Sequence, residues 1–254
     1  MSCFNGEVYL KRCLDSINNQ IGLFEIIIIN DGSTDGTLSI LNSYTFDKKF
    51  INIKIISRPN QGFLSSLDEA ITHANSNLVA RIDQDDMWKS DHLNTLLIEF
   101  KSNNNLVLVG SNSTLIDEFD IEIGRTYFSG DHQKVNKYFY KDNPFVHSSI
   151  MFKKSAYLKT KRYFNEISNN NELIGDYYLF YQLSKEGDIK IINKNTLYYR
   201  VLSNSMSRSI KMASNYSQRL KIMRIIYHNN NKYAFYSKLH QMFVELKIIY
   251  LKLR

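Results

Sequence analysis

Residues 78–88 read LVARIDQDDMW, and this stretch decides how the first half of the chain folds. A short apolar run leads directly into Asp83, Asp85 and Asp86, with Trp88 right behind and no basic residue among the acids. Because three neighbouring carboxylates repel one another, such a cluster is tolerated only where water solvates it or a cation binds to it. The stretch therefore predicts a buried strand with a group of acids at its carboxyl end.

Similar apolar runs lie on both sides of this stretch, and segments with the apolar spacing of helices separate them. The pattern predicts strands at 25–29, 51–57, 78–82 and 106–111 and helices at 61–74 and 90–101, the last with Ser90 as its N-cap. Continuously apolar strands that alternate with helices predict a mostly parallel sheet covered on both faces. Ligands bind beyond the carboxyl ends of such strands, where Asp31 and the acids at 83–86 both fall.

The second half of the chain has a weaker pattern. It predicts a hairpin over 116–128, a strand over 145–154, a helix over 175–185, a strand over 188–192 and mostly helix after about 205. We expect one domain over 1–209, with a nucleotide-binding half (1–111) and an acceptor half (112–209) that share one sheet. Residues 210–254 are expected to form basic C-terminal helices.

Composition places the chain among globular proteins. Its 254 residues are 43% apolar, enough to bury one sizeable core and too apolar for a disordered chain. No run of eighteen apolar residues and no signal peptide is visible, so the cytoplasm is the expected location. Cys3 and Cys13 lack the further Cys or His of a zinc site and are expected to be small buried residues in a reducing compartment.

The net charge of +7 is unevenly placed. From Lys211 to the end there are nine Lys or Arg residues against one acid, Glu245. Basic and apolar residues mixed in this way suit peripheral contact with an anionic membrane surface or an acidic partner, and equally a packing helix with a solvated basic face. No nucleic-acid reading motif is present, so no nucleic-acid partner is expected.

The acidic turns share features with known metal-binding loops. NDGSTDGT, from Asn30, mimics an EF-hand loop, but the twelfth residue from Asp31 is Asn42 where a bidentate Glu is required. Residues 83–86 place two carboxylates on the same side of an extended chain, and oxygen ligands in small number suit Mg²⁺ or Mn²⁺. A solvated polar loop is the alternative. Glycine-rich dinucleotide loops, P-loops and a nucleophile elbow are absent from the sequence.

Six segments, in order along residues 1 to about 209, resemble glycosyltransferase family 2, the inverting enzymes with the GT-A fold. They are MSCFNGEVYLKRCLDSI, IIIINDGSTDGT, NQGFLSSLDEAI, RIDQDDMW, NPFVHSSIMFKKSAY and GDYYLFYQLSKEG. The resemblance implies an α/β fold of Rossmann-like type, with a mostly parallel sheet flanked by helices and a helical C-terminal segment.

The resemblance also implies roles for individual residues, with Asp83 and Asp85 matching the family's Asp-x-Asp (DXD) motif. The nucleotide-sugar would contact Cys3, Phe4, Asn5, Asp31, Asn60, Gly62, Asp83 and Asp86; Mn²⁺ or Mg²⁺ would bind Asp85 and Asp83; Trp88, His147 and Ser148 would lie near the acceptor; and Asp176 would be the catalytic base. A carboxylate in the first turn of a helix is also stabilised by the helix dipole, whatever its role. Glu172 is the rival base.

Three features depart from the family pattern. The first strand is short at Met1, so the start is expected to be either truncated or assigned too late in the chain. No basic residue follows Gly62. Leu202 replaces a His, a loss for which Arg200, Ser205 or Arg208 would compensate.

The expected reaction is metal-dependent transfer of a sugar from a nucleoside diphosphate, UDP-linked by preference, to a hydroxyl of a glycan, in surface polysaccharide synthesis. A lipid-linked acceptor and contact of 210–254 with the cytoplasmic face of a membrane are further expectations. One alternative is nucleotidyl transfer to a sugar phosphate, although SCFNGEVYLKR lacks the Gly-rich, Arg-bearing loop of such enzymes. The other is an inactive protein that binds nucleotide-sugars or acts as a scaffold.

Overall fold

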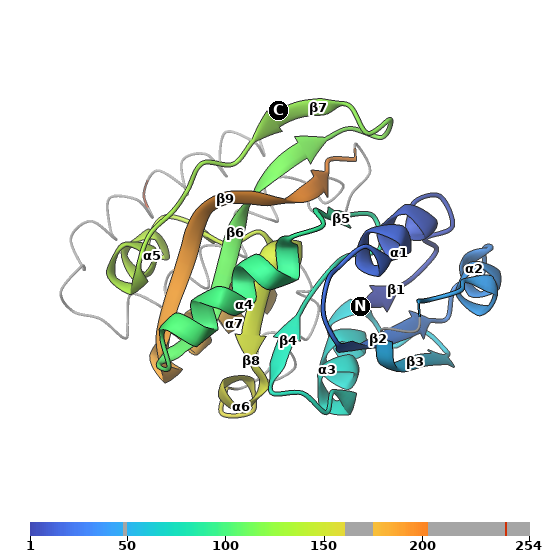
Figure 1. Cartoon of the computed structure of the whole chain (residues 1–254), viewed down its shortest axis with the longest axis horizontal. Coiled ribbons are helices and arrows are strands. Elements are labelled where there is room, and N and C mark those ends of the chain that lie inside the picture. Colours follow the sequence, from blue (N-terminus) through green and yellow to red (C-terminus); the bar gives the residue numbers. More distant parts are fainter. Residues whose placement is uncertain (48–49, 161–174, 203–241, 243–254) are drawn as a thin grey trace.

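The computed structural model describes residues 1–47, 50–160, 175–202 and Met242. The first part of the chain forms a three-stranded parallel sheet in the order β1-β2-β3, with helices between its strands (Figure 1). Its elements are β1 (Ser2–Cys3), α1 (Leu10–Asn18), β2 (Phe24–Asp31), α2 (Thr37–Ser43), β3 (Phe50–Arg58) and α3 (Phe63–His73). The predicted alternation of strands and helices is confirmed here.

The remaining strands form a second, mixed sheet in the order β4-β8-β6-β9-β5, with β7 paired to β6. They are β4 (Leu78–Ala80), β5 (Met87–Trp88), β6 (Leu106–Ile116), β7 (Glu122–Arg125), β8 (Ile150–Lys153) and β9 (Asp188–Arg200). Only the β6–β9 pair is parallel among these described strands. The α/β fold is therefore confirmed. The second sheet combines β4, β5 and the start of β6, from residues 1–111, with β8 and β9 from the later residues, whereas β1, β2 and β3 form a separate sheet. The predicted hairpin forms between β6 and β7, and a hairpin imposes antiparallel pairing.

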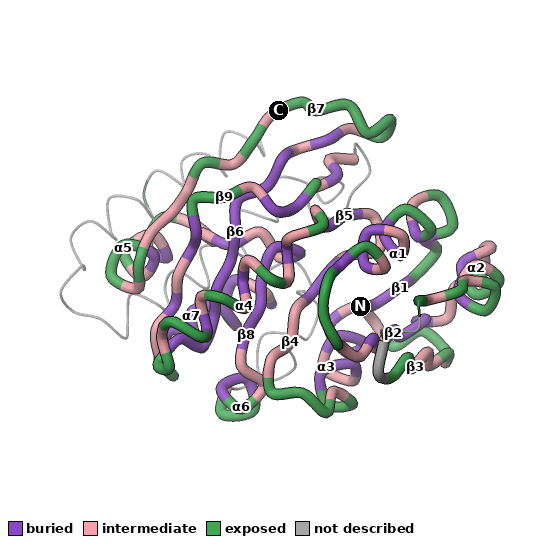
Figure 2. Tube along the Cα trace, in the orientation of Figure 1, coloured by how far each residue is buried: buried purple, intermediate pink, exposed green. Residues whose placement is uncertain are grey.

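Two helices cover opposite faces of the second sheet. α4 (His92–Ser102) packs Leu96 and Phe100 against Met151, while α7 (Gly175–Glu186) packs against Phe152 on the other face. This division follows from the alternation of side chains along each strand, and Figure 2 shows that β6 lies buried between the two layers. The remaining helices are α5 (His132–Tyr138), α6 (Lys154–Tyr157) and a 3-10 turn, His147–Ser149.

The predicted helices at 61–74, 90–101 and 175–185 are α3, α4 and α7. The residue at the N-cap position of α4 is Asp91 and not Ser90. Cys3 and Cys13 are free and buried, as predicted, and burial raises the pKa of Cys3 to about 12.

No helix among the described residues is long and apolar enough to cross a bilayer. The predicted basic helices at 210–254 lie outside the described residues apart from Met242, as do Glu172, Ser205 and Arg208.

A buried histidine beneath the second sheet gives a testable pH dependence. His92 stacks on Trp88 with ring centroids 4.7 Å apart, its Nδ1 lies 2.7 Å from Thr196 Oγ1, and burial lowers its pKa from 6.5 to about 3. Between those pH values the unfolded chain binds a proton that the folded chain does not. The stability that the neutral, buried His92 contributes is therefore fully present above pH 6.5 and is lost as the pH falls from 6.5 toward 3.

Because of His92, we expect the free energy of unfolding to be about 2 kcal/mol lower at pH 5 than at pH 7. Urea titrations at several pH values give the free energy of unfolding of wild type and of His92→Gln. The difference between the two proteins in how this free energy changes with pH is the contribution of His92. His73→Gln, which changes an exposed histidine at the end of α3, is the control. Parallel pH profiles for wild type and His92→Gln would contradict the expectation.

Candidate functional site

Asp83, three residues after the end of β4, is bound on both carboxylate oxygens by Arg81. Arg81 Nη1 donates to Oδ2 at 2.6 Å and Nη2 donates to Oδ1 at 2.5 Å, and the Ser148 hydroxyl donates to Oδ2 at 3.1 Å. Although burial acts in the opposite direction, Arg81 holds the pKa of Asp83 below its ordinary value. No basic residue stands among the acids in the sequence, but Arg81, two residues before Asp83, faces the same side and compensates the charge of its carboxylate.

Asp85 is the acid of the cluster that remains available to a ligand. Its half-buried carboxylate accepts no hydrogen bond from any other residue in the described part of the chain, while its backbone carbonyl accepts one from Arg200 Nε at 2.9 Å. Burial, together with the nearby Asp83, raises the pKa of Asp85 to about 6. A fixed backbone and an unengaged carboxylate are what a cation ligand requires.

Asp86 is 1% exposed and is held by the end of β9. Its Oδ1 accepts the backbone N–H of Arg200 at 2.8 Å, whereas Oδ2 has no partner among the described residues. Burial, with Asp85 and Asp83 close by, raises the pKa of Asp86 well above its ordinary value. Asp86 therefore supports the turn from inside.

Arg200 fastens this acidic turn to the hairpin between β6 and β7. Its side chain is 0% exposed, Nη1 donates to the carbonyl of Asp117 at 2.7 Å, and its guanidinium pairs with the carboxylate of Asp120. The guanidinium also lies 4.3 Å from the ring centroid of Tyr9. Arg200, one of the residues suggested as substitutes for the missing His at Leu202, therefore lies against the acids, whereas the other two are outside the described residues.

Asp31, at the end of β2, organises the loop that follows β3. Its carboxylate is 2% exposed, is paired with Arg58, and accepts the backbone N–H groups of Gln61 at 2.8 Å and Gly62 at 3.0 Å. Asn60 Nδ2 donates to the backbone carbonyl of Asp31 at 2.9 Å. The structure thus brings Asp31, Asn60 and Gly62 together, with the Asp31 carboxylate engaged by the protein itself.

The turn after β1 contacts the acidic turn through Gln84, a residue for which the sequence gives no functional signal. Gln84 Oε1 accepts the N–H of Phe4 at 3.0 Å, and Gln84 Nε2 donates to the Phe4 carbonyl at 2.9 Å. A Cβ at Gly6 would lie 2.3 Å from Gln84 Oε1, so any larger residue there would push the Gln84 amide away from Phe4. Asn5, at φ 49°, donates its N–H to Ser33 Oγ at 3.1 Å.

Three turns, 3–6, 31–35 and 83–86, therefore meet beyond the ends of β1, β2 and β4, as predicted for this edge. Cys3 is buried beneath the first of them, whereas the Phe4 side chain is 47% exposed. A planar ligand at this edge would meet Phe4 first.

Two residues expected near an acceptor, Trp88 and Ser148, are buried and bound by other residues of the protein. Trp88 is 7% exposed and its Nε1 donates to the carbonyl of Ser148 at 2.9 Å, and Ser148 is fully buried against Asp83. The ring of His147 meets Phe63 and Phe180 at centroid distances of 6.0 and 5.8 Å, and burial and Arg81 lower its pKa well below the ordinary value.

Asp176 lies in the first turn of α7, on the same helical face as Phe180 one turn later. Its Oδ2 accepts from Asn143 Nδ2 at 3.0 Å and its Oδ1 accepts the N–H of Tyr177 at 2.7 Å. Phe180 contacts His147, which is close enough to Asp83 to be affected by its charge. This chain of contacts places the start of α7 on the side of the acidic turn.

Comparison with known proteins gives consistent matches. Residues 1–160 match the model of glycosyl transferase family 2. An uncharacterized glycosyltransferase of Haemophilus influenzae is 30% identical over 240 residues, which cover 89% of this chain and 72% of that protein. A chondroitin synthase of Pasteurella multocida is 29% identical over 200 residues, which cover 78% of this chain but 20% of the synthase.

Solved structures add a likeness of fold. Residues 1–349 of TarS from S. aureus, in complex with UDP-GlcNAc, superpose with a TM-score of 0.69 at 16% identity, over 94% of this chain and 68% of that one. The same TarS segment has also been solved in complex with UDP, with a TM-score of 0.68.

Proposed function

Because the chain belongs to glycosyl transferase family 2, we propose that it transfers a sugar from a UDP-linked donor to a hydroxyl of a glycan, inverting the anomeric carbon. The observation that carries this proposal is the state of Asp85, an unengaged carboxylate on a backbone fixed by Arg200 at the meeting point of three turns. Relatives that include a chondroitin synthase and the UDP-GlcNAc complex of TarS support the donor and acceptor classes.

A divalent ion, Mn²⁺ or Mg²⁺, fits the residues present, but Asp83 is replaced by Asp86 as the acid next to Asp85. No three His, Cys, Asp or Glu side chains form a ready metal site among the described residues, but such ions are commonly held by one or two carboxylates together with substrate phosphates and water. Asp85 would hold the ion, with Asp86 beside it, whereas Asp83 is committed to Arg81. The ion would stabilise the negative charge on the leaving diphosphate.

The donor is proposed to occupy the edge formed by the three turns. Phe4 offers an exposed ring against which a nucleobase can stack. The backbone around Asn60 and Gly62 is fixed in place by Asp31 and so presents a preformed wall to the nucleotide.

Asp176 is proposed to take the proton from the attacking hydroxyl of the acceptor. Asn143 and the Tyr177 N–H orient its two oxygens, and a positioned carboxylate base of this kind needs only hydrogen-bond reach to the hydroxyl. His147, beneath Phe63 and Phe180, would shape the wall between donor and acceptor.

The same proposal includes three further points. Residues 1–111 form a donor half and residues 112–209 an acceptor half, the acceptor is lipid-linked, and residues 210–254 contact a membrane. Deletion of 214–254 is expected to reduce co-sedimentation with anionic vesicles if that segment makes the contact.

Release of UDP from a panel of UDP-sugars, in the presence of Mn²⁺ and glycan acceptors, tests the function. We expect turnover with at least one donor and, from NMR of the product, an anomeric configuration opposite to that of the donor. Pyrophosphate release from a nucleoside triphosphate and a sugar phosphate would instead support nucleotidyl transfer. Donor binding with no turnover under any condition would support an inactive binding protein.

A further inference from the structure

The turn of the β6–β7 hairpin presents one carboxylate in a fixed position. Asp117 organises this turn: its Oδ1 accepts the N–H groups of Phe119 and Ile121, both at 2.9 Å, and its own N–H donates to the Ile121 carbonyl at 3.0 Å. Asp120 has a φ of 69°, a left-handed conformation that few residues other than glycine, Asn and Asp adopt. A residue held in this conformation is a reason to ask what its side chain does.

The carboxylate of Asp120 joins two arginines from distant parts of the chain. Arg12, on α1, donates from Nη1 to Oδ2 at 2.8 Å, and Arg200, at the end of β9, pairs with Oδ1. The Arg12 side chain is 51% exposed, whereas that of Arg200 is 0% exposed. Water screens the exposed pair and makes it weak, but the buried guanidinium depends on a counter-ion.

Asp120 is the acid that supplies this counter-ion. The Arg200 guanidinium contacts backbone oxygens elsewhere, because Nε donates to the Asp85 carbonyl at 2.9 Å and Nη1 donates to the Asp117 carbonyl at 2.7 Å. Asp86 accepts the backbone N–H of Arg200 and not its guanidinium. Among the described residues, Asp120 is therefore the one whose carboxylate forms an ion pair with Arg200.

The competing acid is Asp85, which lies next to the same guanidinium. Since Arg200 Nε is 2.9 Å from the backbone oxygen of Asp85, the side chain of that residue needs only a rotation about its own bonds to reach the guanidinium. Burial, together with Asp83, raises the pKa of Asp85, and the nearby positive charge of Arg200 opposes this effect. A guanidinium without a counter-ion at this point would therefore attract the Asp85 carboxylate.

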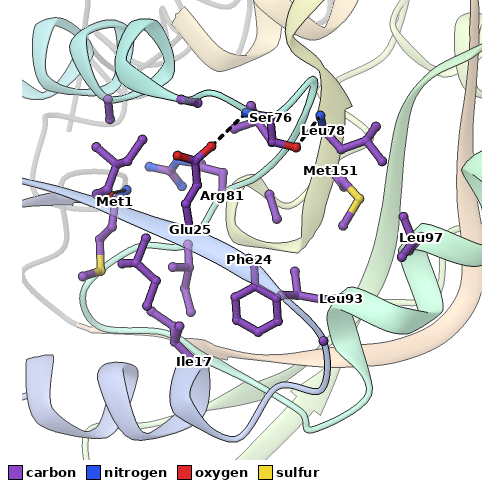
Figure 3. A pocket seen from close by; sticks show the side chains of 18 of the residues that line it. Met1, Ile17, Phe24, Glu25, Ser76, Leu78, Arg81, Leu93, Leu97 and Met151 are labelled. Atoms are coloured by element: carbon purple, nitrogen blue, oxygen red, sulfur yellow. Dashed lines mark hydrogen bonds between the residues drawn. The ribbon is translucent and has the colours of Figure 1, made fainter. Parts of the chain in front are cut away.

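Arg81, the other buried cation beside the acids, does not enter this competition. Both of its terminal nitrogens donate to Asp83, and it also borders a mostly apolar cavity of about 600 Å³ lined by β2 and β4 (Figure 3). A buried guanidinium with an acid on one side and apolar groups on the other stays with the acid, because a buried charge is costly unless it is paired. The freedom of Asp85 is therefore decided at Arg200.

We infer that Asp120 is a positioning residue, which acts as the counter-ion of Arg200 and thereby keeps the Asp85 carboxylate free to bind a cation. The identity of that cation, a divalent ion bound together with UDP, rests on the proposed function. The choice of Arg200 between two carboxylates is a property of the fold and does not depend on the reaction.

Loss of this counter-ion should redirect Arg200 without releasing the acidic turn. The bonds of Arg200 to the Asp86 carboxylate and to the carbonyls of Asp85 and Asp117 do not involve Asp120, so the turn keeps its anchor. The Asp85 carboxylate then pairs with the guanidinium, and a metal ion has to displace that pair before it can bind.

The first test uses neither metal nor donor. Asp120→Asn removes the charge but keeps a residue that tolerates a positive φ, and Asp120→Gly removes the whole side chain at the same φ. In crystal structures of both variants, a carboxylate oxygen of Asp85 should lie within about 4 Å of a guanidinium nitrogen of Arg200, the distance of an ion pair. An Asp85 side chain that keeps its wild-type position in both variants would overturn the inference, whatever reaction the protein catalyses.

The second test measures binding of the ion. Titration calorimetry gives the affinity for UDP at a series of Mn²⁺ concentrations. We expect Asp120→Asn to need about 10- to 100-fold more Mn²⁺ than wild type for half of the strengthening of UDP binding, with the affinity for UDP alone within about twofold. An equal Mn²⁺ requirement in wild type and Asp120→Asn would contradict the inference, as would weaker binding of UDP alone, which would indicate a general loosening of the site.

Arg12→Gln is the matched control. It breaks the other bond of the same carboxylate but leaves the pair between Asp120 and Arg200 in place, so its Mn²⁺ requirement should equal that of wild type. Glu118→Gln removes an exposed charge from the same turn and should also have no effect. A loss in either control as large as that in Asp120→Asn would overturn the inference. If UDP binding by wild type does not respond to Mn²⁺ at all, the metal dependence of the proposed function fails, and the metal-free structures still decide the role of Asp120.

Discussion

Asp176→Asn is expected to lower kcat by about 10²- to 10⁴-fold while leaving donor affinity within about twofold. The amide keeps the size of the carboxylate and can still bond to Tyr177 N–H through its oxygen, but it cannot accept the proton of an acceptor hydroxyl. Because the donor is proposed to bind at the turns around Asp85, the substitution at Asp176 should not change donor affinity. Initial rates of UDP release and titration calorimetry with UDP measure the two quantities.

Asp131→Asn is a matched control for this experiment. Asp131 is also an acid at the start of a helix, where it caps α5 by accepting the N–H of Lys134 at 3.0 Å. Its replacement should leave kcat unchanged. Full activity in Asp176→Asn would remove Asp176 as the base, and equal loss of donor affinity would show that it acts on the donor instead.

Asp85→Asn is expected to lower kcat/KM by about 10²-fold or more and to abolish the strengthening of UDP binding by Mn²⁺. The substitution keeps the hydrogen bond from Arg200 to the backbone carbonyl of residue 85, so the turn should keep its shape while losing a negative ligand. UDP titrations with and without Mn²⁺ measure whether the ion still strengthens binding. Circular dichroism shows independently whether the variant is folded.

Asp91→Asn is the control for this second substitution. Asp91 lies six residues further along and pairs with Lys194 at 2.5 Å on the surface, so its loss should affect neither activity nor the response to Mn²⁺. If Asp85→Asn still responds to Mn²⁺ as wild type does, the ion is held elsewhere or is not used.

The elements that the sequence predicted well are those with a strong local period. α3 and α4 show apolar residues at helical spacing, and α7 begins where predicted. α1 has the same signal, with Leu10, Cys13, Leu14 and Ile17 buried on one face, but it was not recognised among the residues of the family motif. β9 was predicted only to residue 192, because the polar stretch after it hides a strand whose pairing with β6 is irregular there.

Strand pairing and the partners of the acids were harder to predict for different reasons. Arg81 could have been found, because residues two apart on an extended chain face the same side and Arg81 stands two before Asp83. Arg200 and Gln84 could not, because their roles depend on contacts over 80 to 115 residues that leave no local pattern. The acids were predicted at the correct edge because strand ends are a local feature, whereas the bonds that fix each acid are not.

The buried guanidinium that holds the acidic turn has a consequence for biosynthesis. Arg200 is 114 residues beyond Asp86, and a ribosome makes a protein from its amino end. A nascent chain therefore carries all three acids long before it carries the cation that anchors two of them. The edge formed by the three turns can reach its final form only after translation has passed residue 200, so a chain released earlier would contain all three acids in an unfinished arrangement.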